Sequence, residues 1–286
     1  MGTDMNSDLL AWIRQQQDQG MEWFLDEGMP QQQSVATPTQ NPAPVPVPQT
    51  SPVVTSATDK DDPFAQTCQS FVAATLELIQ RHNAQTEFNP AAESEAAEAG
   101  LPETLEQIQA EVTACRACPL YETRTNTVFG AGNPASSLVF IGEAPGADED
   151  RQGKPFVGKS GQLLGKIIEA IGFGREDVFI CNILKCRPPN NRDPQAVEVA
   201  ACENYLKRQL TLIRPRVICC LGRVAAQTLL GTSASLGKLR KTVHFYEGIP
   251  VLATYHPAAL LRNPGWKRDT WEDVRKLRAL HDALSE

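Results

Sequence analysis

Four short, continuous runs of apolar residues punctuate the second half of the chain. They span residues 137–142, 178–182, 217–222 and 251–255, and polar or turn-forming residues bound each of them. Runs of this length and composition are typical of strands that are buried on both faces of a sheet. We therefore predict four core strands in this half of the chain.

Amphipathic segments with helical spacing lie between and around these runs. They cover residues 105–115, 160–171, 194–213, 223–230 and 269–284. Strands that alternate with helices indicate a parallel sheet covered by helices, with binding sites where the strands end. The predicted fold is therefore α/β: a three-layer α/β/α sandwich with a central, mainly parallel four-stranded sheet, in a domain of residues 104–286.

The first 103 residues show a different pattern. Residues 8–27 and 63–82 have apolar residues at helical spacing, whereas residues 31–58 are rich in Pro and Gln and residues 83–100 in Ala and Glu. Segments of the latter two kinds cannot bury a core. We predict a largely disordered, acidic N-terminal arm over residues 1–103, with short amphipathic helices that could bind a protein partner.

Charge is divided unevenly between the arm and the domain. The first 110 residues hold three basic and 16 acidic residues, which leaves 24 basic and 18 acidic residues beyond them although the whole chain carries −7. A basic domain can bind a polyanion, but so small an excess is also typical of an ordinary solvated surface.

No apolar run approaches the roughly 20 residues that span a bilayer, and the N-terminus lacks the features of a signal peptide. We expect a cytoplasmic protein that does not bind membranes.

Four of the eight cysteines form a framework. Cys115 and Cys118 make a C-x-x-C pair, and Cys186 and Cys202 flank a loop rich in Pro and Arg. Cysteines of a cytosolic protein stay reduced, and their thiolates are soft ligands, so this framework favours metal over disulfides. The residues alone allow either zinc or an iron–sulfur cluster. The remaining cysteines are interpreted as small apolar residues: Cys68, Cys181, Cys219 and Cys220.

Polar residues stand at three of the predicted strand ends. Glu143 follows the first run within the turn of residues 142–146, Asn182 ends the second run, and His256 follows the fourth. The carboxyl ends of parallel strands meet at one edge of a sheet, so these side chains should converge. A capping role, an Asx-turn or a structural histidine would explain each residue alone. Their combination predicts a functional site.

Residues 153–160 (GKPFVGKS) match the phosphate-binding expression G-x-x-x-x-G-K-[ST] and precede a predicted helix. About ten residues separate this motif from the preceding strand, however, and Pro155 removes one backbone donor. Nucleotide hydrolysis is therefore the weaker interpretation. Phe156 is better explained as a platform on which a planar base stacks.

Several of these motifs together resemble a known family. Residues 142–146, 154–161 (KPFVGKSG), Asn182, the four framework cysteines and 256–264 (HPAALLRNP) are similar to the iron–sulfur uracil-DNA glycosylases, family four of that superfamily. The resemblance covers about residues 113–283 and leaves the arm outside. It implies a monomeric, monofunctional enzyme that flips uracil out of DNA and leaves an abasic site. It also implies a [4Fe-4S] cluster on Cys115, Cys118, Cys186 and Cys202.

The resemblance further implies roles for individual residues. Glu143, Asn182 and His256 would be catalytic: Asn182 would bond N3–H and O4 of uracil, and His256 would donate to O2 as negative charge develops on the leaving base. Phe156 would stack on uracil in a pocket that Gly142, Ala144 and Gly146 also line. DNA would be bound by Lys159, Ser160, Leu260, Leu261 and Arg262, with Leu260 as the wedge that enters the duplex.

Two positions of the motif leave functions unassigned. Ala144 stands where other superfamily members have a group that activates water, and Gly146 where they have an aromatic ring that excludes the thymine methyl. Glu143 could orient the water, and the acidic residues 148–150 could substitute for it or only cap a solvated turn.

The alternative function is that of a non-catalytic iron–sulfur protein that binds nucleic acid as a replication or repair accessory. The intact polar residues at the strand ends argue against it.

Overall fold

The computed structural model describes residues 63–85 and 103–285 of the 286-residue chain, so the predictions for segments 8–27, 31–58 and most of 83–100 lie outside the described residues. In those two ranges no helix is both long and apolar enough to cross a bilayer. The strands are β1 (Ala131–Gly132), β2 (Leu138–Gly142), β3 (Phe179–Asn182), β4 (Val217–Leu221), β5 (His244–Tyr246) and β6 (Ile249–Thr254). The α-helices are α3 (Pro63–Gln85), α4 (Leu105–Ala114), α5 (Ala147–Gln152), α6 (Lys159–Ala170), α7 (Ala196–Ile213), α8 (Arg223–Leu229), α9 (Leu236–Leu239), α10 (Pro257–Arg262) and α11 (Lys267–Ala283).

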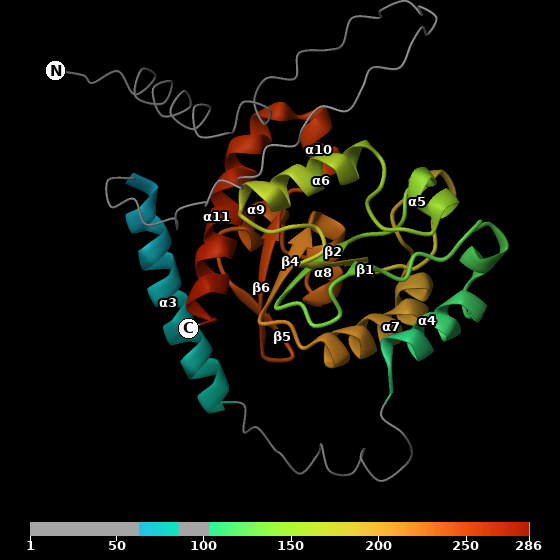
Figure 1. Cartoon of the computed structure of the whole chain (residues 1–286), viewed down its shortest axis with the longest axis horizontal. Coiled ribbons are helices and arrows are strands. Elements are labelled where there is room, and N and C mark those ends of the chain that lie inside the picture. Colours follow the sequence, from blue (N-terminus) through green and yellow to red (C-terminus); the bar gives the residue numbers. More distant parts are fainter. Residues whose placement is uncertain (1–62, 86–102, 286) are drawn as a thin grey trace, which may run out of the picture. The chain divides into compact units, whose positions relative to one another are not determined.

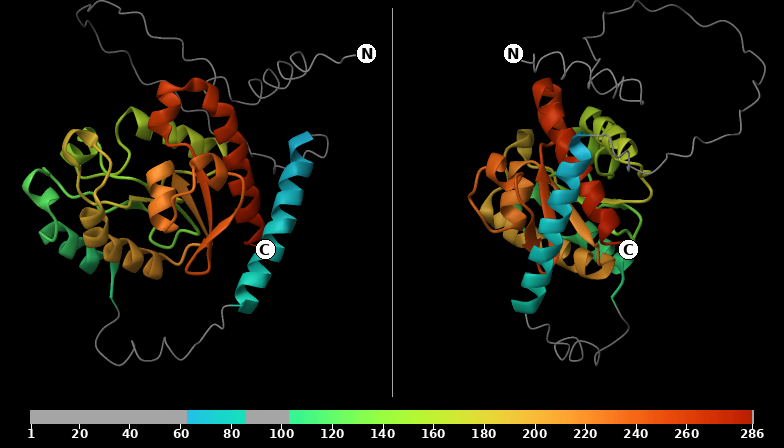
Figure 2. Two further views of the ribbon diagram at one scale, coloured as in Figure 1. Left: turned by 180° about the vertical axis from the view of Figure 1, so that it is seen from behind. Right: turned by 90° about the vertical axis from the view of Figure 1, so that its left-hand side faces the viewer.

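The sheet has the strand order β1-β3-β2-β4-β6-β5. Figure 1 labels five of these strands, all except β3. Its four central strands, β3, β2, β4 and β6, pair in parallel, and they are the four strands that the apolar runs predict. Two short edge strands, β1 and β5, pair antiparallel to this core and were not predicted. Seen from the side, the sheet lies between two layers of helices (Figure 2), which confirms the three-layer α/β/α prediction.

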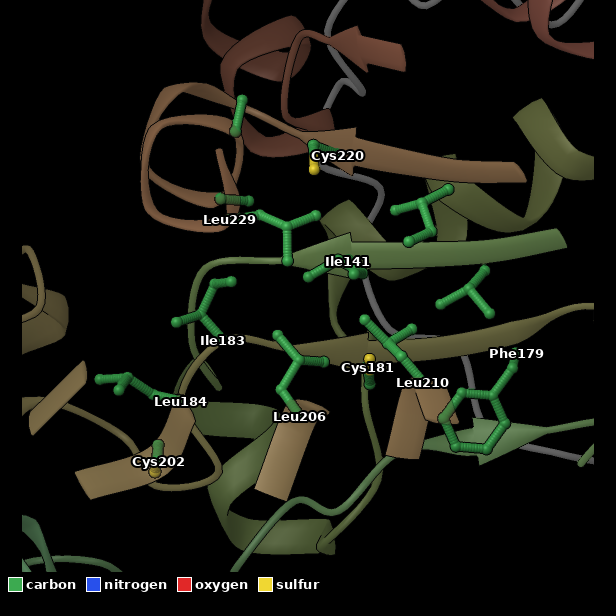
Figure 3. Close-up of a cluster of buried hydrophobic side chains, with 14 of the residues drawn as sticks. Ile141, Phe179, Cys181, Ile183, Leu184, Cys202, Leu206, Leu210, Cys220 and Leu229 are labelled. Atoms are coloured by element: carbon green, nitrogen blue, oxygen red, sulfur yellow. The ribbon is translucent and has the colours of Figure 1, made fainter. Parts of the chain in front are cut away.

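Alternation along the buried strands divides the core between the two faces of the sheet. Ile141, Cys181 and Cys220 lie on one face and pack against Leu206 and Leu210 of α7 (Figure 3). Alternate residues of the same strands face the opposite layer, which includes α11. Cys181, Cys219 and Cys220 are buried within strands, as the sequence predicts, and Cys68 is buried in α3.

Helix α3 packs against α11, although the sequence analysis assigned its residues to the arm. The Arg275 guanidinium lies 4.6 Å from the centre of the Phe64 ring, and the Lys276 ammonium 5.7 Å from that of Phe71. Helix α3 accordingly belongs to the same compact unit as the domain. Helix α3 therefore covers part of the domain surface, and the structural unit extends N-terminal of the predicted boundary at residue 104.

Candidate active site

The ends of β2 and β3 hold the first two candidate residues side by side. Gly142 pairs with Asn182, and the parallel pairing continues one step further because the amides of Ile183 and Leu184 donate to the carbonyls of Gly142 (2.9 Å) and Glu143 (3.0 Å). His256 follows two residues after β6. Glu143, Asn182 and His256 all line one cleft of about 390 Å³, so the structure brings together the residues that the sequence singles out.

Asn182 carries a buried hydrogen-bond acceptor that faces this cleft without a partner. Its side chain is 1% exposed, and within the described structure Oδ1 accepts no hydrogen bond. A methyl group at Gly142 would lie 2.3 Å from that oxygen and 2.7 Å from Cζ of Phe156. Leaving a buried acceptor unsatisfied is costly. The cleft therefore contains a position at which the N–H of a ligand would be stabilised.

Phe156 is held beside this position by an unusual loop conformation. Its φ of +51° lies in the left-handed region, which is unfavourable for an aromatic residue and persists only where neighbours enforce it. Nη2 of Arg175 donates to the carbonyls of Pro155 (2.5 Å) and Phe156 (2.9 Å). Gly161 allows a close approach, because an added Cβ would lie 1.9 Å from the Phe156 oxygen. The ring ends 5.6 Å from that of His256, at an angle of 31°.

The carboxylate of Glu149 anchors the other half of the same loop. Oε1 accepts hydrogen bonds from the amides of Val157 (2.9 Å) and Gly158 (3.0 Å). These amides belong to the GKPFVGKS motif, and a carboxylate bound to them opposes phosphate binding there. Helix α5 also separates the motif from β2. The geometry thus disfavours the nucleotide-binding interpretation.

Two of the three acidic residues of α5, Glu149 and Asp150, are not part of a solvated cap, so the sequence interpretation is wrong for them, whereas Asp148 is partly exposed and pairs with Arg151. Glu149 and Asp150 are buried, and Asp150 accepts from the amides of Thr125 (2.9 Å) and Asn126 (3.3 Å). A methyl group at Gly146 would lie 2.6 Å from Oε2 of Glu149. The carboxylate therefore lies beside the position at which an aromatic side chain is missing.

The imidazole of His256 is neutral and its tautomer is fixed. Nδ1 accepts a hydrogen bond from the amide of Ala258 at 3.1 Å, at the N-terminus of α10, so the ring proton lies on Nε2. Burial and the positive charge of Arg262 lower the pKa of His256 to about 4, and the attraction of Glu149 offsets part of this shift. At neutral pH the ring can donate from Nε2 without carrying a charge.

Glu143 is prepared to exchange a proton near neutral pH. Burial and the negative charge of Asp193 raise the pKa of Glu143 to about 7, and Arg223 offsets part of this shift. Arg223 is itself bound to Asp193, with Nη2 2.7 Å from Oδ2. A carboxyl group with this pKa is suited to act as a general base on water.

One wall of the cleft was not predicted from the sequence. Pro188, Asn191, Arg192 and Asp193 line it, all from the loop between the third and fourth framework cysteines. Arg192 donates to both carboxylate oxygens of Glu198, at 2.9 and 2.5 Å. The density of Pro and Arg in this loop was the available signal, but the residues reach the cleft only through the tertiary fold.

The residues predicted to bind DNA differ in their position and in their exposure to solvent. Ser160 and Arg262 line the cleft, and Lys159 is exposed at the start of α6. The expectation that Leu260 is a wedge does not hold in this structure, because its side chain is fully buried where α10 packs against α6. Leu261 is 43% exposed and is the leucine of α10 that can reach a duplex.

The four framework cysteines line one small cavity between α4, α7 and the segment after β3. Nη1 of Arg124 donates to Sγ of Cys186 at 3.1 Å. Burial raises the pKa of Cys202 to about 11, partly offset by the backbone amide of Lys185. Across the described ranges no three Cys, His, Asp or Glu side chains meet closely enough to bind one metal ion. A cluster spreads its thiolate ligands over several iron atoms, and the shared cavity and the Arg124 contact fit such a group.

Comparison with known proteins agrees with this geometry. Residues 129–275 match the sequence model of the Uracil DNA glycosylase superfamily, and they contain every strand of the described residues and every residue that lines the cleft. The chain is 47% identical to the type-4 uracil-DNA glycosylase of Archaeoglobus fulgidus over 183 residues, which are 61% of this chain and 92% of that protein. It is 43% identical to the Thermotoga maritima protein of the same name, over 62% of this chain and 94% of that protein.

More distant similarity separates this chain from a neighbouring family. Identity to a type-5 uracil-DNA glycosylase of Pyrobaculum aerophilum is 33%, over 47% of this chain and 66% of that protein. The chain belongs to the uracil-DNA glycosylase superfamily and, within it, to the type-4 family.

Proposed function

We propose that this protein hydrolyses the N-glycosidic bond of deoxyuridine in DNA, releases uracil and leaves an abasic site. The observation that carries the proposal is the buried, unpartnered Oδ1 of Asn182 in a cleft that also holds a neutral His256. The target base must be flipped into such a cleft, since its glycosidic bond is inaccessible in a duplex. The family membership of the chain supports the same activity.

Recognition of uracil rests on Asn182 and Phe156. Oδ1 of Asn182 accepts from N3–H of uracil while the amide group donates to O4, and Phe156 stacks on the ring. Cytosine has an acceptor at N3 and a donor at its exocyclic amine, so it would leave both groups of the amide unpaired. Sites that lose such buried hydrogen bonds discriminate strongly. Gly142 contributes by its lack of a side chain.

His256 and Glu143 have separate roles in the cleavage of the glycosidic bond. The oxygen of a water molecule bonds to C1′ as the C1′–N1 bond breaks, and the electron pair of that bond leaves with the uracil. Nε2–H of His256 donates to O2 and stabilises the developing anion. Glu143, whose pKa is raised to about 7, takes the proton that the water loses. Glu143 would thus activate the water, which the side chain of Ala144 cannot do.

Exclusion of thymine needs a wall near Gly146. Oε2 of Glu149 lies there, held in place because Oε1 is bound to the amides of Val157 and Gly158. Ala144 and Gly146 line the same cleft. We propose that this carboxylate occupies space that an aromatic ring fills elsewhere in the superfamily.

DNA outside the flipped nucleotide would be held by exposed residues around the cleft. Leu261 takes the role of wedge, since it is exposed and Leu260 is not. Arg262, Lys159 and Ser160 would contact phosphates on either side. The combination fixes the strand while the base enters the cleft.

The framework cysteines would hold a [4Fe-4S] cluster. Cys115, Cys118, Cys186 and Cys202 share one cavity, and the type-4 relatives support iron over zinc. When bound, the cluster would join three parts of the chain: the segment between α4 and β1, the loop between β3 and α7, and α7 itself. That loop lines the cleft, so its support bears on the shape of the site.

The remaining proposals concern the whole chain. We place the glycosylase domain at residues 104–286, with α3 (residues 63–85) packed on it, and assign the rest of residues 1–103 to an acidic arm that binds a protein partner. The protein would act as a cytoplasmic monomer on uracil-containing DNA. Gel filtration tests whether the protein is a monomer. Capture of a partner by the isolated arm tests whether the arm binds another protein.

An assay for abasic sites tests the central proposal. Anaerobically purified protein is incubated in EDTA without nucleotide, with oligonucleotides that contain one uracil or one thymine at the same position, and is then treated with hot alkali. We expect a strand break only at uracil. Tight DNA binding without a break would favour the non-catalytic alternative.

A further inference from the structure

Trp266 is an exposed aromatic residue close to the cleft. It is 40% exposed, whereas Trp271 is buried, and it ends a segment, residues 261–266, in which every residue is exposed. The segment begins in α10, where Arg262 lines the cleft, and the 3-10 turn that carries Trp266 (Pro264–Trp266) contacts α10. The surface around Trp266 is therefore continuous with the residues at which DNA would enter the cleft.

The indole of Trp266 is stacked on a second aromatic ring. Its partner is the phenol ring of Tyr255, with the ring centres 4.6 Å apart and an angle of 14° between the planes. Tyr255 directly precedes His256 in the chain, so the stack stands next to a residue of the cleft. One face of the indole is occupied in this way, and the exposure of Trp266 indicates that much of its remaining ring surface meets solvent.

A largely buried ion pair supports this stack. The guanidinium carbon of Arg240 lies 4.2 Å from the centre of the Tyr255 ring, and two groups so close to one ring centre must lie on opposite faces of it. Nε of Arg240 donates to Oδ2 of Asp273 at 2.6 Å, and the hydroxyl of Thr254 donates to the same oxygen at 2.7 Å. The indole is thereby held in one orientation, which lowers the entropy lost when a ligand stacks on it.

The ligand that fits this surface is an unpaired nucleobase. Every base has a π-face, and an exposed aromatic side chain is the usual group on which the bases of a single strand stack. Bases inside a closed duplex are already stacked and paired, so they do not offer a free face. Arg262 in the same exposed segment supplies a positive charge for a phosphate of the strand. A protein bound to these residues would cover the approach to the cleft, so their position favours DNA.

We propose that Trp266 stacks on an unpaired base of the DNA strand that carries the target nucleotide, and that Tyr255 is a positioning residue for the indole. Single-stranded or opened DNA then gains a contact that a closed duplex cannot make. Leu261, at the other end of the exposed segment, acts on the duplex instead, so one segment serves both forms of DNA. The inference rests on the proposed function in its choice of DNA as the ligand.

Anisotropy titrations of the full chain with a labelled, uracil-free oligonucleotide of thymidines test the stacking without turnover. In Trp266→Leu we expect the affinity for this single strand to fall roughly tenfold or more, as the loss of one base–aromatic stack does, whereas Trp266→Phe should stay within about threefold of the wild type. Affinity for the matching duplex should change by less than about twofold. The slope of log affinity against log salt concentration should stay the same, because no phosphate contact is lost.

The control is Leu78→Ala, since Leu78 in α3 is 39% exposed, about as much as Trp266. This variant should bind both forms of DNA as the wild type does. Equal losses of single-strand affinity in Trp266→Leu and Trp266→Phe overturn the inference, because stacking requires an aromatic ring. Unchanged affinity in both variants also overturns it and would leave the surface to a protein partner.

A double-mutant cycle tests the role of Tyr255. Tyr255→Leu removes the ring on which the indole rests and should weaken single-strand binding by roughly fivefold, whereas Tyr255→Phe keeps the ring and should bind as the wild type does. In the Trp266→Leu background the change Tyr255→Leu should have no further effect, because Tyr255 acts through the indole. Additive losses in the double variant would show that Tyr255 affects binding by another route and would overturn its positioning role.

These binding measurements separate the inference from the proposed function, because the oligonucleotide contains no uracil. A wild type that binds the single strand but releases no uracil from a uracil-containing strand would disprove the glycosylase proposal and leave the stacking on Trp266 decided by the variants above. A wild type that does not bind the single strand overturns the stacking itself, whatever its activity.

Discussion

The backbone amide of Ala258 donates to Nδ1 of His256 at 3.1 Å, and this one hydrogen bond determines what the imidazole can do. With Nδ1 occupied as an acceptor, only Nε2 carries a proton, and the lowered pKa of about 4 keeps the ring neutral. A neutral donor gains strength as charge develops on uracil O2 and gives little in the ground state. The site is therefore arranged for the transition state rather than for the substrate.

Replacing His256 should affect the chemical step alone. We expect His256→Ala to lower the single-turnover rate of uracil release by roughly 10²- to 10³-fold, because one preorganised donor to a developing oxyanion is lost. The dissociation constant for uracil-containing DNA should stay within about twofold. An equal loss of affinity would contradict the assignment.

The lowered pKa of His256 should make the free energy of unfolding depend on pH in a definite direction. Its pKa is about 4 in the folded protein against 6.5 for the free side chain, so the unfolded chain binds a proton that the folded protein excludes. The free energy of unfolding should fall as pH falls through 6.5 towards 4, and this part of the decline should be absent in His256→Ala. Denaturant titrations of both proteins across that range measure it.

Glu143 should govern the pH dependence of uracil release. Its pKa is raised to about 7 and only the carboxylate form accepts a proton, so the single-turnover rate should rise with pH up to about 7 and then level off. Glu143→Gln should be slower and nearly flat over the same range. The effect on stability runs the other way: the folded protein retains a proton that the unfolded chain releases above 4.5, so this contribution is lost as pH rises towards 7. A wild-type profile without an inflection near 7 would remove Glu143 as the base.

Gly142 should be required for access to Asn182. An added methyl group would lie 2.3 Å from Oδ1 of that residue, so Gly142→Ala should block the position of the uracil ring. We expect at least a roughly hundredfold loss of uracil release, in line with the dependence of rate on positioning. Gly165→Ala in α6 is the matched control, since nothing lies within 4 Å of its added methyl group. Similar activity in the two variants would show that the base does not bind there.

The two leucines of α10 should have opposite effects. Leu260 is fully buried, so Leu260→Ala should lower the free energy of unfolding by about 2–5 kcal/mol. Leu261 is 43% exposed, so Leu261→Ala should leave stability nearly unchanged and slow uracil release from duplex DNA more than from single strands. Equal rates on the two substrates for Leu261→Ala would exclude it as the wedge.

Much of this architecture could be predicted from the sequence because its signals are local. Continuous apolar runs mark the four central strands, and the polar residues that follow them must share one edge of a parallel sheet. Strands β1 and β5 were missed because they have two and three residues, too few to show a periodic pattern. Their pairing depends on neighbouring strands that are distant in sequence.

Contacts between distant segments could not be predicted in this way. Glu149 and Arg175 hold the loop that carries Phe156, but nothing in their sequence surroundings distinguishes them from surface residues. The burial of Leu260 instead of Leu261 depends on how α10 packs against α6.

The most direct test of the account is a change of base specificity at Asn182. Asn182→Asp, in its protonated form, presents a donor to N3 of cytosine and an acceptor to its exocyclic amine, whereas it lacks the amide that donates to uracil O4. We predict that uracil release falls by roughly a hundredfold or more and that release of cytosine becomes measurable. Asn133→Asp is the control, because Oδ1 of Asn133 accepts from the amide of Ala135 at 2.9 Å and a carboxylate can do the same. Uracil release at the wild-type rate by Asn182→Asp would contradict the assignment of Asn182 as the residue that recognises uracil.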